Sequence, residues 1–192
     1  TMGGVLILMG LTFGTLLWAD LRNVYIWWLL IVTWAFGAVG YLDDYFKVIR
    51  KNPKGLASRW KFRLLMISAT VVSMGLFHAQ DTWVSQGFLF TPFFKHLFWN
   101  LGPWYIAFSV LVIVGTSNAV NLTDGLDWLA GGTLLAAFGA YGAISFSQGR
   151  IDLAAFCGVI IGALLAFLWF NINPARFFMG DTGSMSLGVT LG

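Results

Sequence analysis

The stretch Asn118-Ala119-Val120-Asn121-Leu122-Thr123-Asp124-Gly125-Leu126-Asp127 lies between two long apolar runs, 103–115 and 129–146. A segment with two Asn and two Asp at the end of an apolar span costs free energy unless the protein uses those groups. The two Asn are three residues apart, as are the two Asp, so each pair shares one face of a helix. We therefore expect the other informative residues to converge on this stretch from one side of a membrane.

The composition predicts an integral membrane protein. Of 192 residues, 58% are hydrophobic and 10% are charged, whereas soluble domains carry about 25% charged residues. All the acidic residues are Asp, which is unusual for solvated helices and suggests that these carboxylates are placed for a purpose. The single Cys157 lies in an apolar run and excludes a disulfide framework or a cysteine metal site.

The predicted fold class is all-α, a polytopic transmembrane helix bundle with six spans and the start of a seventh. Crossing about 30 Å of hydrocarbon takes roughly 20 helical residues. The apolar runs that meet or approach this length cover about 3–19, 24–42, 62–79, 104–121, 129–147 and 153–171, and the seventh begins near Gly183. Thr1 leads straight into one run and Gly192 stops inside another. We expect 1–192 to be one transmembrane catalytic domain, an internal piece of a longer protein truncated at both ends.

The basic residues orient the bundle. Seven of the eleven lie between positions 47 and 63, and the positive-inside bias makes that loop cytoplasmic. Counting spans outward places 122–128 and 172–182 on the same side and the connection 80–103 outside. Five carboxylates then share the cytoplasmic face: Asp43, Asp44, Asp124, Asp127 and Asp181. Carboxylates beside a basic loop predict a site for a cation and a phosphate-rich ligand. On the outer side, 83–90 is expected to form a hairpin or lie flat, and 92–99 a short interfacial helix.

Two further segments supply candidate chemistry. Asp43 and Asp44 end the second span, where an acidic pair opposes the helix macrodipole, and Lys47 follows one turn later. Most of the basic loop is explained by topology and by attraction to anionic lipid. After the sixth span, Gly180 and Gly183 bracket Asp181 in a tight turn. Asp181 is a candidate Mg²⁺ ligand with phosphates completing the shell, and Phe178 is a candidate to stack on a base.

The chain resembles the polyprenyl-phosphate phosphosugar transferases, and within them the muramoyl-pentapeptide branch. Four motifs carry the resemblance, in order along the chain: Thr1-Met2-Gly3-Gly4, Asp43-Asp44-Tyr45, Asn118 to Asp127, and Asn171 to Gly183 with its Pro-Ala-x-x-Phe-Met-Gly-Asp-Thr-Gly core. One departure is Trp128, which stands where the family pattern has Gly. The family has about ten spans and further segments at both ends, including a His-rich motif, so we expect these 192 residues alone to be incomplete as a catalyst.

The resemblance implies a Mg²⁺-dependent reaction in peptidoglycan synthesis at the cytoplasmic face of the bacterial inner membrane. UDP-MurNAc-pentapeptide and undecaprenyl phosphate would give lipid I and UMP, with membrane lipid but no nucleic acid as a partner, and relatives suggest a homodimer. Asp181 would bind Mg²⁺, and Asp43 and Asp44 would be the catalytic acidic pair. The implied substrate-binding residues are Thr1, Lys47, Asn118, Asn121, Asp124, Gly125, Leu126, Asp127, Asn171 and Phe178.

Three other functions stay open at this point. A sister transferase would move GlcNAc- or GalNAc-1-phosphate to the same type of lipid. An ion-coupled transporter is a second alternative, because intramembrane Asp often mark proton paths, although here the acids gather at one surface and not at the midplane. A non-catalytic remnant is the third, suggested by the two chain ends and by Trp128.

Overall fold

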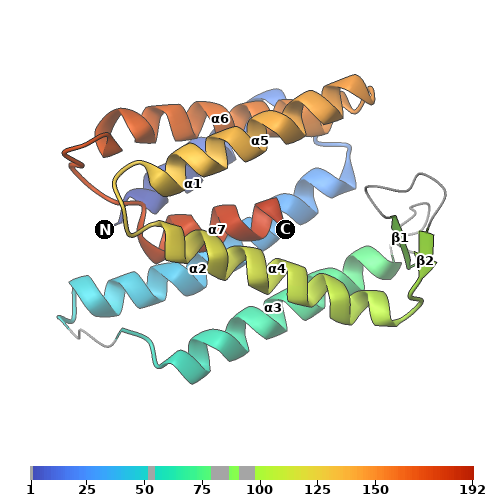
Figure 1. Ribbon diagram of the computed structural model, residues 1–192, viewed down its shortest axis with the longest axis horizontal. Helices are drawn as coiled ribbons and strands as arrows, with labels where there is room; N and C mark the ends of the chain where they lie inside the picture. Colours follow the sequence, from blue (N-terminus) through green and yellow to red (C-terminus); the bar gives the residue numbers. More distant parts are fainter. Residues whose placement is uncertain (1, 52–54, 79–86, 91–97) are drawn as a thin grey trace.

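The computed structural model describes residues 2–51, 55–78, 87–90 and 98–192. Over these residues the chain forms helices and one short hairpin (Figure 1). The elements are α1 (Gly3–Trp18), α2 (Val24–Val48), α3 (Ser58–His78), β1 (Phe88–Phe90), β2 (Phe98–Asn100), α4 (Trp104–Thr123), α5 (Leu129–Ser147), α6 (Ile151–Asn171) and α7 (Gly180–Leu191). The predicted all-α, multi-pass architecture is confirmed.

Among the described residues, five helices, α2 to α6, are long and apolar enough to cross a membrane. Helix α1 has 16 residues, about 24 Å at 1.5 Å per residue, which is shorter than a typical span. Helix α2 runs to Val48, beyond its predicted end at 42. The acidic pair does not stop it, because Asp43 and Lys47 form an ion pair one turn apart.

The outer connection differs from its prediction where the structure describes it. Strand β1 pairs antiparallel with β2, and Leu89 lies opposite Trp99. The interfacial helix expected over 92–99 is therefore wrong at Phe98 and Trp99, because aromatic residues are favoured in strands and the pairing with β1 satisfies their backbone groups. Residues 92–97 and 83–86 of these predictions lie outside the described residues.

Helix α7 occupies the middle of the bundle (Figure 1). Its residues from Thr182 to Val189 are all buried. Leu187 joins a core formed mainly by α1, α5 and α6, and Met185 joins a second core formed with α2, α3 and α4. Packing against both cores fixes the position of α7, and with it the position of its first turn, relative to the helices that form them.

Two glycines let α1 and α2 approach the start of α7 closely. A Cβ added at Gly4 would lie 2.1 Å from the backbone nitrogen of Gly183. A Cβ added at Gly40 would lie 2.3 Å from the carbonyl oxygen of Asp181. Neither distance is compatible with a side chain, since the atoms approached belong to the backbone. Small residues therefore determine how near Asp181 lies to α2.

The loops that carry the candidate residues meet at one end of the bundle, as the alternation of spans predicts. The ends of α2, α4 and α6 and the starts of α3, α5 and α7 lie together at the left in Figure 1, and the hairpin lies at the opposite end. We call the former the basic end, after the residues between positions 47 and 63.

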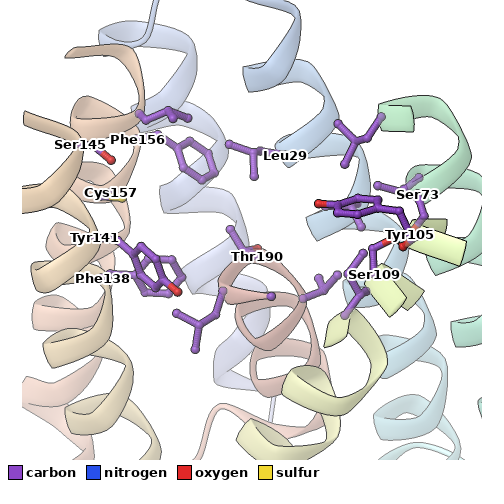
Figure 2. A pocket seen from close by; sticks show the side chains of 18 residues that line it. Leu29, Ser73, Tyr105, Ser109, Phe138, Tyr141, Ser145, Phe156, Cys157 and Thr190 are labelled. Carbon is purple, nitrogen blue, oxygen red and sulfur yellow. Dashed lines mark hydrogen bonds between the residues drawn. The ribbon is translucent and has the colours of Figure 1, made fainter. Parts of the chain in front are cut away.

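A cavity of about 340 Å³ lies toward the hairpin end, beyond the last turn of α7 (Figure 2). Apolar side chains dominate its lining, together with the hydroxyl groups of Tyr105, Ser109, Tyr141 and Thr190. Its described lining includes no acidic or basic side chain, so this cavity does not supply the groups that acid–base or phosphoryl chemistry needs.

Candidate active site

The first turn of α7 is held by carboxylates from two other helices. The backbone N–H of Gly180 donates to Asp124 Oδ2 at 2.8 Å. The N–H of Thr182 donates to Asp44 Oδ2 at 3.0 Å, and the Thr182 hydroxyl donates to the same oxygen at 2.7 Å. Free amides and the positive end of the helix dipole favour negative charge at this place. Asp44 and Asp124 thus act as caps supplied by α2 and by the end of α4.

This arrangement depends on the backbone of Gly180, whose φ of 71° is in the left-handed region that favours glycine. In this conformation the N–H of Gly180 donates to Asp124 as α7 begins. The N–H of Asp181 also donates to Asp44, at 3.3 Å. The conformation of one residue therefore brings three acidic groups to the same helix end.

Two lysines form ion pairs with Asp43 and Asp181. Lys61 Nζ lies 2.6 Å from Asp181 Oδ2 and 3.6 Å from Asp43 Oδ2. Lys47 Nζ lies 3.1 Å from Asp181 Oδ2 and 2.5 Å from Asp43 Oδ2. Asp43 is 2% exposed, and its Oδ1 accepts the N–H of Leu56 at 2.6 Å. Asp43 and Asp181 thus share two ammonium groups from α2 and α3.

Lys61 is a site residue that the sequence reasoning missed. In the sequence it is one of seven basic residues between positions 47 and 63, and topology alone accounts for such a run. The distinguishing signal is its place three residues into α3, which begins at Ser58. At that position the side chain points to Asp181 and not to solvent, and it is 19% exposed.

The pKa values of Asp124 and Asp181, which lie outside the membrane-spanning helices, shift in opposite directions. Burial raises the pKa of Asp124 to about 6, and the nearby charges of Asp181 and Asp44 add to this effect. Burial also acts to raise the pKa of Asp181, but its contacts with Asp43, Lys61 and Lys47 outweigh burial and hold that pKa below its usual range. At neutral pH Asp181 is ionised, and the raised pKa brings the titration of Asp124 nearer to the physiological range.

Many of the predicted residues line one cavity of about 440 Å³ at the basic end. The predicted residues in its wall are Asp44, Lys47, Asn121, Asp124, Gly125, Phe178 and Asp181. Val48, Leu122 and Gly180 complete it and were not predicted. The amide oxygen of Asn121 also accepts the Ser184 hydroxyl at 3.0 Å, which orients that side chain toward α7.

The remaining predicted residues that the structure describes lie outside this wall. Asn118 donates to the carbonyl of Val114 in its own helix, and Leu126 is 66% exposed. Asp127 accepts from the side chain of Asn173 and the N–H of Ala175. Thr1, also predicted to bind substrate, lies outside the described residues. Asp43 is not in the wall and lies next to it through its contacts with Lys47 and Asp181.

Asn171 has a structural role in the geometry. It is 2% exposed, its Oδ1 accepts the N–H of Trp128 at 2.8 Å, and its Nδ2 donates to the carbonyl of Phe177 at 2.9 Å. Asn171 therefore links the start of α5 to the segment that leads into α7. Trp128 itself has a left-handed φ of 56°, a conformation that normally favours glycine, and its indole is 61% exposed.

The donor set is compatible with Mg²⁺. Mg²⁺ in phosphate-handling sites takes one or two carboxylates, with water and phosphate oxygens completing the shell. Asp181, Asp44, Asp124 and the amide of Asn121 place carboxylate and amide groups around one cavity. Among the described residues no cluster of three or more His, Cys, Asp or Glu is arranged to enclose a metal, so the protein would contribute few ligands of its own.

The fold and this site define the class of protein. The family model described as glycosyl transferase family 4 matches residues 26–192, and the chain belongs to that family. A curated relative from Pelobacter propionicus (strain DSM 2379 / NBRC 103807 / OttBd1) is named phospho-N-acetylmuramoyl-pentapeptide-transferase. It is 47% identical over 210 aligned positions, which cover 100% of this chain and 57% of the relative. The chain thus spans little more than half the length of that relative.

Proposed function

We propose that this chain forms the catalytic part of an enzyme that transfers phospho-MurNAc-pentapeptide from UDP-MurNAc-pentapeptide to undecaprenyl phosphate, giving lipid I and UMP. The observation that carries the proposal is the convergence of Asp44, Asp124 and Asp181 on one cavity at the basic end. The name of the relative at 47% identity supports this particular donor. The long apolar helices and the basic residues between positions 47 and 63 support an inner-membrane location with the site facing the cytoplasm, and a homodimer is part of the proposal.

The residues of the site suit phosphoryl transfer, in which positioning and charge neutralisation supply most of the catalysis. The lipid phosphate oxygen attacks the β-phosphorus of the donor, and the bond from that phosphorus to the UMP oxygen breaks. Lys47 lines the cavity and offers an ammonium group to the developing phosphate charge. Lys61 and Asp43 hold Lys47 and Asp181 in place, so Asp43 acts on the reaction as a positioning residue.

Asp44 and Asp124 have a different part in the proposal. Both line the cavity while they cap α7, so each can contact a ligand without losing its structural contact. Mg²⁺, when bound through Asp181 and its neighbours, would supply neutralisation of the diphosphate. Phe178 and Gly125 lie in the same wall and are suited to contact the uracil ring, because an aromatic ring stacks on a base.

The donor is tested by supplying the intact protein that carries this chain with undecaprenyl phosphate and one nucleotide sugar at a time. We expect UMP release with UDP-MurNAc-pentapeptide and at most trace release with UDP-GlcNAc. Turnover with UDP-GlcNAc alone would assign the chain to a sister reaction. Substrate uptake into vesicles without any UMP would favour a transporter.

A further inference from the structure

The basic residues between positions 47 and 63 divide into two groups in the structure. Lys47 and Lys61 point inward and pair with Asp43 and Asp181. The others that the structure describes are all exposed: Arg50, Lys51, Arg59 and Arg63. None of these four forms an ion pair with a carboxylate of the described residues. We call this second group the basic collar.

Two members of the basic collar are stacked on aromatic rings. The guanidinium carbon of Arg50 lies 5.3 Å from the centre of the Phe46 ring, and that of Arg63 lies 5.4 Å from the Trp60 ring. A stacked guanidinium contacts the ring through its face and keeps the N–H groups at its edge available. Those N–H groups match the spacing of phosphate oxygens, so the two stacked arginines are suited to bind a phosphate ligand.

Apolar side chains lie among the charges of the basic collar. Trp60 is 58% exposed, Phe62 is 54% exposed and Ile49 is 57% exposed. Arg59, Phe62 and Arg63 are spaced three and four residues apart, so they share one face of α3. Helix α3 has 21 residues, about 31 Å, which is close to the thickness of the hydrocarbon, so its N-terminal end lies near the membrane boundary when the helix crosses it. Cations and aromatics alternating at that depth match a lipid surface, with phosphate above and acyl chain below.

We propose that the basic collar is a binding surface for the phosphate groups of anionic phospholipids in the leaflet that the active site faces. The acids nearest to the basic collar are paired with Lys47 and Lys61 or bound to the first turn of α7. The positive charges of the collar therefore remain available to phosphate groups. The collar is separate from the wall of the proposed active site, which includes none of its four residues. Lipid binding at the collar is therefore separable from the transfer reaction.

The test compares lipid binding by the intact protein in detergent, titrated with phosphatidylglycerol or phosphatidylcholine and measured by native mass spectrometry. The variant Arg59→Gln/Arg63→Gln removes two charges from the collar. Each basic residue near an anionic surface favours binding on the order of fivefold, so we expect the preference for phosphatidylglycerol to fall by roughly twentyfold. The matched control is Arg22→Gln/Arg150→Gln, which removes two exposed charges at the hairpin end and should change the preference less than about twofold.

A second variant, Arg59→Lys/Arg63→Lys, separates charge from structure. It should keep an intermediate preference, since the charge is retained while the planar guanidinium groups, including the one that Arg63 stacks on Trp60, are lost. Equal losses in the collar and control variants, or no loss in either, would overturn the proposal. So would a lysine variant that falls as far as the glutamine variant. A glutamine variant with normal lipid preference but a raised KM for the nucleotide donor would show that the collar serves the soluble substrate. Because binding is measured without substrate, its failure and a failure of the proposed reaction are distinguishable.

Discussion

Replacing Lys61 with Met removes the ammonium group that lies closest to Asp181. Lys61 Nζ is 2.6 Å from Asp181 Oδ2 and 3.6 Å from Asp43 Oδ2, and the side chains are 19%, 14% and 3% exposed in that order. Removing one partner of a buried ion pair costs about 3–5 kcal/mol, because the other charge stays buried without compensation. Lys47 still contacts both carboxylates in the variant, so we expect the lower end, about 3 kcal/mol.

Lys47 offers the matched comparison. It contacts the same two oxygens, but its side chain is 40% exposed, and exposed ion pairs contribute only about 0–1 kcal/mol. Lys47→Met should therefore cost about 1 kcal/mol of stability while it lowers activity, since Lys47 lines the proposed site. The two methionine variants are therefore predicted to lose different amounts of stability, although the two lysines contact the same carboxylates.

The assay is the thermal unfolding of the intact protein in detergent, followed by loss of tertiary signal, with Lys61→Arg as the charge-retaining control. We expect Lys61→Met to unfold at the lowest temperature, Lys47→Met at an intermediate one, and Lys61→Arg close to the wild type. A Lys47 variant less stable than the Lys61 variant, or a Lys61→Met protein as stable as the wild type, would refute the assignment of Lys61 as the inner partner of the acids.

The remaining predictions concern the same helix end. Gly40→Ala places a Cβ 2.3 Å from the carbonyl oxygen of Asp181 and should cost about 1–3 kcal/mol by overpacking, whereas Gly158→Ala, with nothing within 4 Å, should be neutral or stabilising in the same unfolding assay. Asn171→Ala removes two buried hydrogen bonds and should cost about 2–3 kcal/mol; an unchanged unfolding temperature would contradict its linking role. Burial raises the pKa of Asp124 to about 6, so the native state disfavours its ionised form. The stability that comes with this raised pKa is fully present below about pH 4, the ordinary pKa of Asp, and is lost as the pH rises through 6. Asp124→Asn should therefore be more stable than the wild type at pH 8 and equal to it near pH 4, and a difference that grows on acidification would refute this sign.

The sequence predicted the spans well because hydropathy over about 20 residues directly reflects the thickness of the hydrocarbon. It also predicted that the segments around Asp44, Asp124 and Asp181 meet, since alternating spans return every second loop to the same side. Lys61 was not distinguishable, because which basic residue of a loop turns inward depends on where α3 begins. Asn171 is predicted from its motif to bind substrate, but in the structure its side chain hydrogen-bonds to backbone groups of this fold. The sequence alone does not distinguish these two uses of a polar residue. The pairing of β1 with β2 is a contact between distant segments, and the pattern of 92–99 alone favoured a helix.

The central claim is that Asp181 belongs to a magnesium-dependent nucleotide-sugar site at the basic end. It is tested most directly by UMP release from UDP-MurNAc-pentapeptide, measured for the intact protein and its Asp181→Asn variant with and without Mg²⁺. Asn118→Ala is the control, since Asn118 contacts the Val114 carbonyl of its own helix and lies outside the cavity wall. We expect Mg²⁺-dependent release by the wild type and by Asn118→Ala, and a loss of at least about a hundredfold for Asp181→Asn. Undiminished release by Asp181→Asn would contradict it.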